Sequence, residues 1–294
     1  MWQAEYIASR LGQIGVESVL VPLVSRGDVD MRPIDGSRSV GMFTKRIQQA
    51  LVDQEADIAV HSLKDLPTEA TLHFQLAAVT EREVVHDSLV SPDAWSLGDL
   101  PEGARIGTGS RRRAAQLLIA RKDLQILPIR GNVQTRLKKL ADNEYDAIVL
   151  AEAGLLRLQM SETPRTTLSL EMMLPAPGQG ALGIEVRSDD KAAAEIVGTL
   201  DDAPTRAAVT AERTLLASLH GGCLAPIAAY ARVENEKLIM NALVAATDGS
   251  EQIVVEGEVA YRNDEPLDCG QQLGQQLAEQ MIGQGARELI QQSR

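Results

Sequence analysis

The first two-thirds of the chain repeatedly alternates short apolar runs with longer amphipathic runs, and this pattern constrains the fold more than any other feature. Short runs bounded by glycine and polar residues are typical of buried strands, whereas amphipathic runs of several turns are typical of helices. We expect strands over residues 16–24, 56–62, 104–107, 125–129 and 145–150, and helices over 43–52, 111–121 and 133–141. Strands separated by helices at this spacing predict parallel sheets of the α/β class.

The last third of the sequence follows a different pattern. A helix predicted over 205–219 ends at Gly221-Gly222-Cys223, and a final helix is expected over 267–292. Three segments that alternate polar and apolar residues lie between them, at 227–233, 237–246 and 252–260. Short turns separate these segments, which predicts a three-stranded antiparallel sheet. The sequence therefore predicts two α/β domains followed by a smaller α+β domain.

Composition and charge exclude several classes of protein. The chain has 294 residues, of which 44% are hydrophobic, and this suits folded domains rather than a disordered or fibrous chain. No apolar run is long enough to span a membrane, and residues 1–6 do not resemble the start of a signal peptide. A net charge of −12 with only 3% aromatic residues argues against nucleic acid or a membrane surface as a partner.

The two cysteines, Cys223 and Cys269, are too few for a disulfide framework and suit a reducing cytoplasm. Together with four histidines at scattered positions they form no recognisable metal site. Cys223 lies in a glycine loop, where its thiol would be open to modification, although a small buried hydrophobe is the ordinary alternative. We expect Cys269, within the final helix, to have that ordinary role.

Polar and basic side chains gather where three predicted strands end. In open parallel sheets these ends line the crevice in which ligands bind, and the helix N-termini beside them attract anions. Arginine adds paired donors that match a carboxylate. The sequence therefore favours a ligand with several separate acid groups. The segments are His61-Ser62-Leu63-Lys64-Asp65, Gly107-Thr108-Gly109-Ser110 with Arg112 and Arg113, and Arg130-Gly131-Asn132 with Arg136.

Each of these segments also has an ordinary interpretation. Ser110 is a natural N-cap for the helix that follows it. Arg136 has Asp142 and Glu144 nearby as surface partners, and His61 suits a core position. The joint placement of the segments at strand ends is what favours a ligand site.

Five segments, in order along nearly the whole chain, resemble the porphobilinogen deaminase (hydroxymethylbilane synthase) family. They are Val60 to Thr68, Gly107 to Arg113, Arg130 to Leu137, Leu174-Pro175-Ala176-Pro177-Gly178-Gln179-Gly180-Ala181, and Ala211-Glu212-Arg213 with Gly221-Gly222-Cys223.

This resemblance implies an enzyme that condenses four porphobilinogen molecules, with loss of ammonia, into linear hydroxymethylbilane. It implies a dipyrromethane cofactor joined to Cys223 by a thioether, and Asp65 as the catalytic residue that stabilises the cationic intermediate. It further assigns Lys64, Thr108, Ser110, Arg112 and Arg113 to the cofactor, and Arg130, Arg136 and Arg157 to the substrate.

The same resemblance implies a domain organisation and a setting. Two periplasmic-binding-protein-like α/β domains would comprise 1–82 with 178–200, and 83–177, followed by a C-terminal α+β domain over 201–294. We expect a cytoplasmic monomer whose partner is the small-molecule substrate, with no nucleic acid, membrane or metal.

The sequence departs from the family pattern at two places. The family usually has a strand and an Arg-x-Ser turn before the Trp-Gln found here as Trp2-Gln3, so we expect a gap in the first sheet and a misplaced start or a truncated sequence. Val40 stands where the family commonly has lysine, and Arg38 is the nearest substitute.

Two alternatives stay open on the sequence alone. A degenerate relative would fold without polymerising pyrroles, as the missing strand and Val40 would allow. A non-catalytic, two-lobed anion-binding protein would need no Gly-Gly-Cys loop, and such bacterial proteins are commonly exported, whereas we expect no export signal here.

Overall fold

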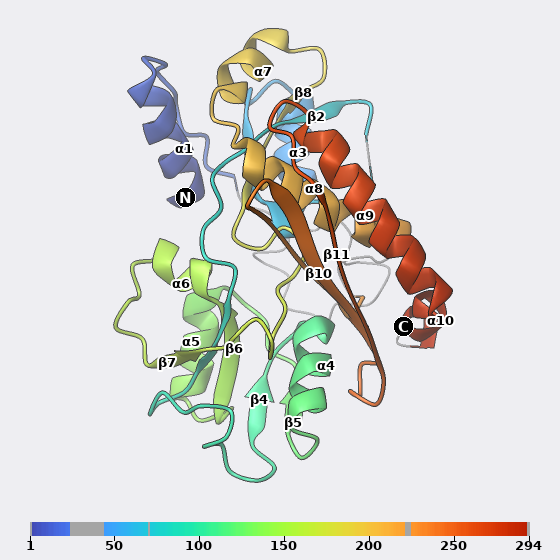
Figure 1. Cartoon of the computed structure of the whole chain (residues 1–294). Helices are drawn as coiled ribbons and strands as arrows, with labels where there is room; N and C mark the ends of the chain where they lie inside the picture. Colours follow the sequence, from blue (N-terminus) through green and yellow to red (C-terminus); the bar gives the residue numbers. More distant parts are fainter. Residues whose placement is uncertain (1, 24–43, 70, 221–224, 293–294) are drawn as a thin grey trace.

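The computed structural model describes residues 2–23, 44–69, 71–220 and 225–292, which form two α/β lobes and a C-terminal body (Figure 1). The expected mixed α/β class with a C-terminal antiparallel sheet is confirmed. Arg38, Val40 and Cys223 lie outside the described residues, so the expectations for them stay untested.

The first lobe is built on a three-stranded sheet of order β1-β8-β2. Both strand pairs are antiparallel. The core on this sheet joins Ile7 and Leu11 to Ile184 and Val186. Its elements are α1 (Trp2–Gln13), α3 (Lys45–Val52), β1 (Ala59–Ser62), a 3₁₀ turn η1 (Leu63–Asp65), β2 (Phe74–Val79), β8 (Leu182–Arg187) and α7 (Lys191–Gly198).

The second lobe has a five-stranded sheet of order β5-β4-β6-β3-β7. Strand β4 is parallel to both of its neighbours, whereas β3 is antiparallel to both of its own. The elements are β3 (Asp87–Val90), β4 (Arg105–Gly107), α4 (Arg111–Ala120), β5 (Gln125–Leu127), α5 (Val133–Ala141), β6 (Ala147–Ala151), α6 (Glu152–Arg157) and β7 (Arg165–Thr167).

The C-terminal body packs helices on one face of the predicted antiparallel sheet, and α9 runs along β11 (Figure 1). Alanines and leucines of α8 and α9 fill its core, as the shortage of aromatic residues requires. The elements are α8 (Ala203–Ser218), β9 (Ile227–Glu234), β10 (Lys237–Ala245), β11 (Gln252–Ala260), α9 (Pro266–Gly283) and α10 (Ala286–Gln292).

Three expectations about secondary structure were wrong. Residues 16–23 form no strand, and Val19 is 89% exposed, because a β-branched run becomes a strand only when it finds a sheet partner. The sheets are not parallel throughout, since β1 and β2 each pair with β8 in antiparallel fashion and β3 pairs with β6 in the same way. The final helix is broken between α9 and α10 at Gly285, whose φ of +92° lies outside the helical region.

The chain crosses between the two lobes twice. It leaves the first sheet after β2 and returns to it at β8, and the two crossing segments contact each other. The Glu83 N–H donates to the Gly180 carbonyl at 3.2 Å, and Arg82 Nε donates to the Gln179 carbonyl at 2.8 Å. The candidate site lies beside these crossings.

Candidate functional site

The first lobe contributes Lys64 and Asp65 from the 3₁₀ turn that follows β1. Leu63 and Leu66 are buried on either side of them and anchor the turn. Arg213 of α8 fixes the same turn from the C-terminal body by donating to the carbonyls of Leu66 at 2.8 Å and Pro67 at 2.7 Å. Asp65 is thereby held exposed while Lys64 is half-buried.

The second lobe contributes two buried arginines from the first turn of α4. Arg112 and Arg113 are only 4% and 6% exposed. Ser110 caps this helix by accepting a hydrogen bond from the Arg113 N–H, as expected, and its own N–H donates to Thr108 Oγ1 at 3.1 Å. The turn before α4 therefore sets the direction in which both arginines leave the helix.

Arg130 and Arg136 flank the start of α5, and both are half-buried. Asn132 caps the helix by accepting from the Thr135 N–H at 2.9 Å. Arg136 donates through Nε to the Gly131 carbonyl at 2.8 Å. The alternative in which Arg136 pairs with Asp142 was wrong, because Lys138 takes that carboxylate at 2.6 Å.

Charged groups of the two lobes influence one another's pKa values. Burial lowers the pKa of Lys64 from 10.5 to about 8; Asp65 opposes this shift, and Arg113 adds to it. Burial also lowers the pKa of Arg136, with further lowering by Arg113 and Arg130 and an opposing effect of Asp65. Charges of each lobe therefore affect the pKa values of groups in the other lobe. Cations outnumber carboxylates among these groups.

Sequence reasoning missed Asp87, the carboxylate at the centre of this cluster. Its two oxygens accept from Arg112 Nη2 and Arg113 Nη2, both at 2.7 Å, and Gln179 Nε2 donates to it at 2.9 Å. Gln179 also accepts from Lys64 Nζ at 3.3 Å. A carboxylate at the head of the fully buried strand β3 was the available signal, since such a group needs cationic partners.

Asp87 does not use up the donors of the two arginines. Arg112 Nε and Arg113 Nε are buried and have no hydrogen-bond partner among the described residues. Buried polar groups are seldom left unpaired, and these two enclosed N–H groups are exceptions. A second lobe carrying several arginines fits a ligand with more than one carboxylate.

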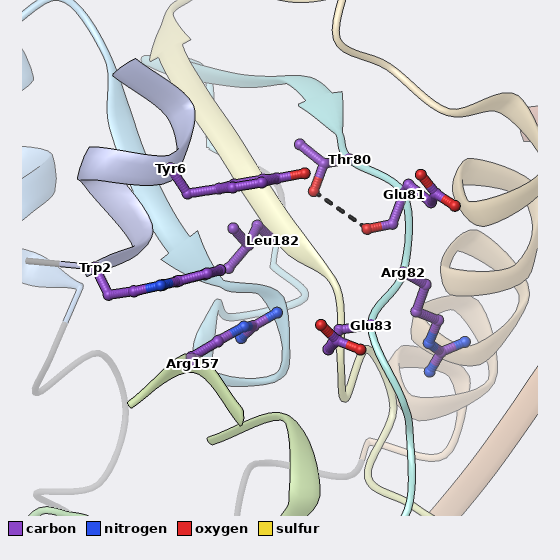
Figure 2. Close-up of a pocket in the computed structure, with 8 residues that line it drawn as sticks. All are labelled: Trp2, Tyr6, Thr80, Glu81, Arg82, Glu83, Arg157 and Leu182. Carbon is purple, nitrogen blue, oxygen red and sulfur yellow. Dashed lines mark hydrogen bonds between the residues drawn. The ribbon is translucent and has the colours of Figure 1, made fainter. Parts of the chain in front are cut away.

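Arg157 lies in a different place, in a pocket of about 330 Å³ (Figure 2). Its guanidinium is 5.7 Å from the centre of the Trp2 ring, which stacks on Tyr6. It donates to the Gly180 carbonyl at 2.7 Å, and burial lowers its pKa while Glu83 opposes the shift. The structure thus places Arg157 against α1 and the crossing segments.

Cys269 and His61, the other residues considered in the sequence, are both buried. Cys269 is 1% exposed within the core of the C-terminal body, as expected. His61 is buried, and its Nε2 lies 2.9 Å from Glu185, close enough for an ion pair though not aligned as a hydrogen bond. Across the described parts of the chain, no helix has both the length and the apolar character needed to cross a membrane.

Comparison with known proteins identifies the family. The family model "Porphobilinogen deaminase, dipyromethane cofactor binding domain" matches residues 1–195, and the corresponding C-terminal domain model matches residues 206–281. The chain is 43% identical to the porphobilinogen deaminase of Syntrophotalea carbinolica over 99% of its own length and 91% of that protein. It is 48% identical to the porphobilinogen deaminase of Desulforudis audaxviator over 85% of its length and 79% of that protein.

A solved substrate-binding protein of an amino acid ABC transporter is similar at 12% identity and a TM-score of 0.36, over 68% of this chain and 79% of that one. The family matches cover both lobes and the C-terminal body. The chain belongs to the porphobilinogen deaminase family.

Proposed function

We propose that this chain carries out the reaction of its family, hydroxymethylbilane synthesis, with the residues that converge between its two lobes. That reaction condenses four porphobilinogen molecules head to tail, releases ammonia and gives linear hydroxymethylbilane. The chain is accordingly a transferase of tetrapyrrole biosynthesis, which includes the route to haem. The observation that carries the proposal is the convergence of cations from both lobes, because hydrogen bonds through Gln179 and Asp87 connect Lys64 with Arg112 and Arg113.

The cluster fits the cofactor of the family. Each pyrrole ring carries two carboxylates, and the Nη atoms of Arg112 and Arg113 keep N–H groups beyond those that bind Asp87 and the backbone carbonyls. Lys64 and the start of α4, with Thr108 and Ser110, complete a donor set suited to carboxylates. When bound, the dipyrromethane supplies the pyrrole to which the first substrate is joined.

Asp65 is the carboxylate proposed for the chemistry. It is exposed in the site and lies close enough to Lys64 and Arg136 to influence both. A fixed carboxylate stabilises the positive charge that develops on a pyrrole as its amine leaves, and it accepts hydrogen bonds from pyrrole N–H groups.

Arg130 and Arg136 are proposed to receive the carboxylates of incoming porphobilinogen, because they lie at the rim of the cluster and remain half-buried. Bidentate contact from a guanidinium would fix the orientation of the substrate as well as its position. Arg157 is proposed as a further substrate contact from the side of the crossing segments, where it faces a pocket (Figure 2).

Cys223 is the proposed attachment point of the cofactor. The other cysteine, Cys269, is enclosed in the core between α8 and α9, where no ligand of this size would reach it. Cys223 stands in a Gly-Gly-Cys sequence that follows the end of α8, the helix whose Arg213 holds the Asp65 turn. A thioether there would join the cofactor to the segment that follows α8 in the sequence.

The test is the intact mass of the purified protein beside a Cys223→Ser variant, both produced in a host that makes porphobilinogen. We expect a mass excess of one dipyrromethane on the first and none on the second, followed by turnover of porphobilinogen by the first. An excess on both would move the attachment away from Cys223. No excess on either would favour the degenerate relative.

We propose further that the domains comprise 1–82 with 178–200, 83–177 and 201–294, since each of the three sheets falls within one of them. A cytoplasmic monomer is the proposed working form, as the family resemblance implies. Light scattering during size-exclusion chromatography would test the monomer by giving a mass near 31.7 kDa.

A further inference from the structure

Asp87 is the most deeply buried charge in the cluster, with a side chain that is 0% exposed. It sits at the start of β3, where the chain enters the second lobe from the first crossing segment. Burial alone would raise its pKa, but Arg112 and Arg113 outweigh burial and hold the pKa below its usual range. Asp87 is therefore a permanent anion inside a site that binds anions.

The negative charge of Asp87 weakens the attraction of the site for carboxylates, so its presence there calls for an explanation. The hydrogen bonds that Asp87 makes provide that explanation. Each oxygen of Asp87 binds a different arginine at 2.7 Å, and each arginine makes a second bond to a backbone carbonyl, of Leu174 at 2.6 Å and of Val149 at 2.9 Å. Both guanidinium groups are thus fixed at two points while Nε stays without a partner among the described residues.

We infer that Asp87 is a positioning residue, which orients the guanidinium groups of Arg112 and Arg113 so that their remaining N–H groups meet the carboxylates of the cofactor. This inference rests on the proposed function. Gln179 extends the arrangement to the first lobe, because its amide donates to Asp87 at 2.9 Å and accepts from Lys64 at 3.3 Å. The cations of both lobes are therefore arranged around one carboxylate.

Replacing Asp87 by asparagine separates the effect of charge from the effect of orientation, because the two change the rate of anion binding in opposite directions. Asparagine has the shape of aspartate, but its amide nitrogen is a donor and cannot accept from the second arginine. The site would gain one positive charge and lose one of its two oriented guanidinium groups. If charge alone mattered, Asp87→Asn would bind anions faster; if orientation matters, it would bind them more slowly.

The experiment uses full-length protein produced without porphobilinogen and then mixed with porphobilinogen. Mass spectrometry follows the fraction that gains the mass of one dipyrromethane. We expect Asp87→Asn to gain it at least about tenfold more slowly than the unmodified chain, as the loss of one charge-assisted contact implies. Loading at an equal or greater rate by folded Asp87→Asn would overturn the inference.

Asp123→Asn is the matched control, because it also removes an arginine-paired carboxylate from the second lobe. Asp123 pairs with Arg121 at 2.6 Å on the surface. This control is expected to load at the rate of the unmodified chain. Absence of any mass gain in the unmodified chain would instead refute the proposed function, so the two failures are distinguishable.

A second variant keeps the test valid if Asp87→Asn does not fold. Asp87→Asn combined with Arg113→Met removes both members of a buried pair and preserves the charge balance, which is far less disruptive than leaving an unpaired charge. In the double variant the oxygen of the introduced amide would still accept from Arg112. If Asp87 acts through the arginines, the double variant loads no more slowly than Arg113→Met alone. A further slowing of about tenfold would overturn the inference.

Discussion

Two aspartates of the site show how surroundings decide what a carboxylate does. Asp87 is enclosed and accepts three hydrogen bonds from protein side chains. Asp65 is exposed on a 3₁₀ turn, and cations lie near it. The first is suited to holding other side chains in place, and the second is free to act on a substrate.

Asp65→Asn should therefore abolish most turnover without releasing the cofactor. The amide keeps the shape of the side chain but removes the negative charge that stabilises a cationic pyrrole, which costs on the order of 100-fold to 1000-fold in kcat. Turnover of porphobilinogen and intact mass would be measured on the same preparation. Asp57→Asn, which alters an exposed ion pair with Arg187 in the same lobe, is the control. Wild-type kcat in Asp65→Asn would remove this residue from the catalytic role.

Lys64 gives the site a dependence on pH. Burial lowers its pKa to about 8, so it carries its charge below that pH and loses it as the pH rises further. Binding of carboxylates favours the charged form, and cofactor loading should fall about tenfold as the pH rises through 8. Lys64→Arg stays charged, so its loading rate should decline less. Parallel pH profiles for the two proteins would contradict the assignment.

At the scale of elements, the sequence predicted what local patterns determine. Strand β11 and helix α5 have the expected bounds, since alternation and an amphipathic stripe are local signals. The expectation of wholly parallel sheets was wrong because each antiparallel pair of the two lobes includes β2, β3, β7 or β8, where no strand was expected. The run at 16–23 failed for a related reason, since its pattern does not reveal whether a partner strand is available.

In the candidate site too, local sequence patterns were predictable and contacts between distant segments were not. The segments before α4 and α5 were predictable because glycines, caps and arginines stand together in the sequence. The carboxylate of Asp87 was a visible signal, but its partners were not predictable, since they are arginines 25 and 26 residues away and Gln179 from the second crossing segment. The surroundings of Arg157 were equally unpredictable, because they are assembled from α1, α6 and the first crossing segment.

Gly131 tests how the start of α5 positions its arginines. Its φ is +105°, and a Cβ there would lie 2.6 Å from Thr135 Cγ2. Gly131→Ala should therefore lower the free energy of unfolding by about 1–3 kcal/mol and weaken substrate binding, because the Gly131 carbonyl also fixes Arg136. Chemical denaturation and KM would be measured. Gly12→Ala, where a Cβ meets nothing within 4 Å, is the control, and equal effects in both would contradict the prediction.

At the scale of the whole molecule, one buried carboxylate connects the two crossing segments to the C-terminal body. Glu212 of α8 is 0% exposed and accepts two bonds from Arg82 of the first crossing, at 2.7 and 3.0 Å. It also accepts from the N–H groups of Gly178 in the second crossing, at 2.6 Å, and of Ala231 in β9, at 2.8 Å. The C-terminal body and both crossing segments are thus tied to the same point.

Glu212→Gln should destabilise the protein by about 3–5 kcal/mol, because it leaves the guanidinium of Arg82 buried without its counter-charge. The amide also presents a donor to a backbone N–H that needs an acceptor. Denaturation would be followed both by circular dichroism and by protease cleavage of the crossing segments, which we expect to become accessible first. Glu258→Gln, which alters an exposed pair with Lys237, should cost less than about 1 kcal/mol. If Glu212→Gln cost no more than this control, the C-terminal body would have to be held by its apolar contacts with α4 instead.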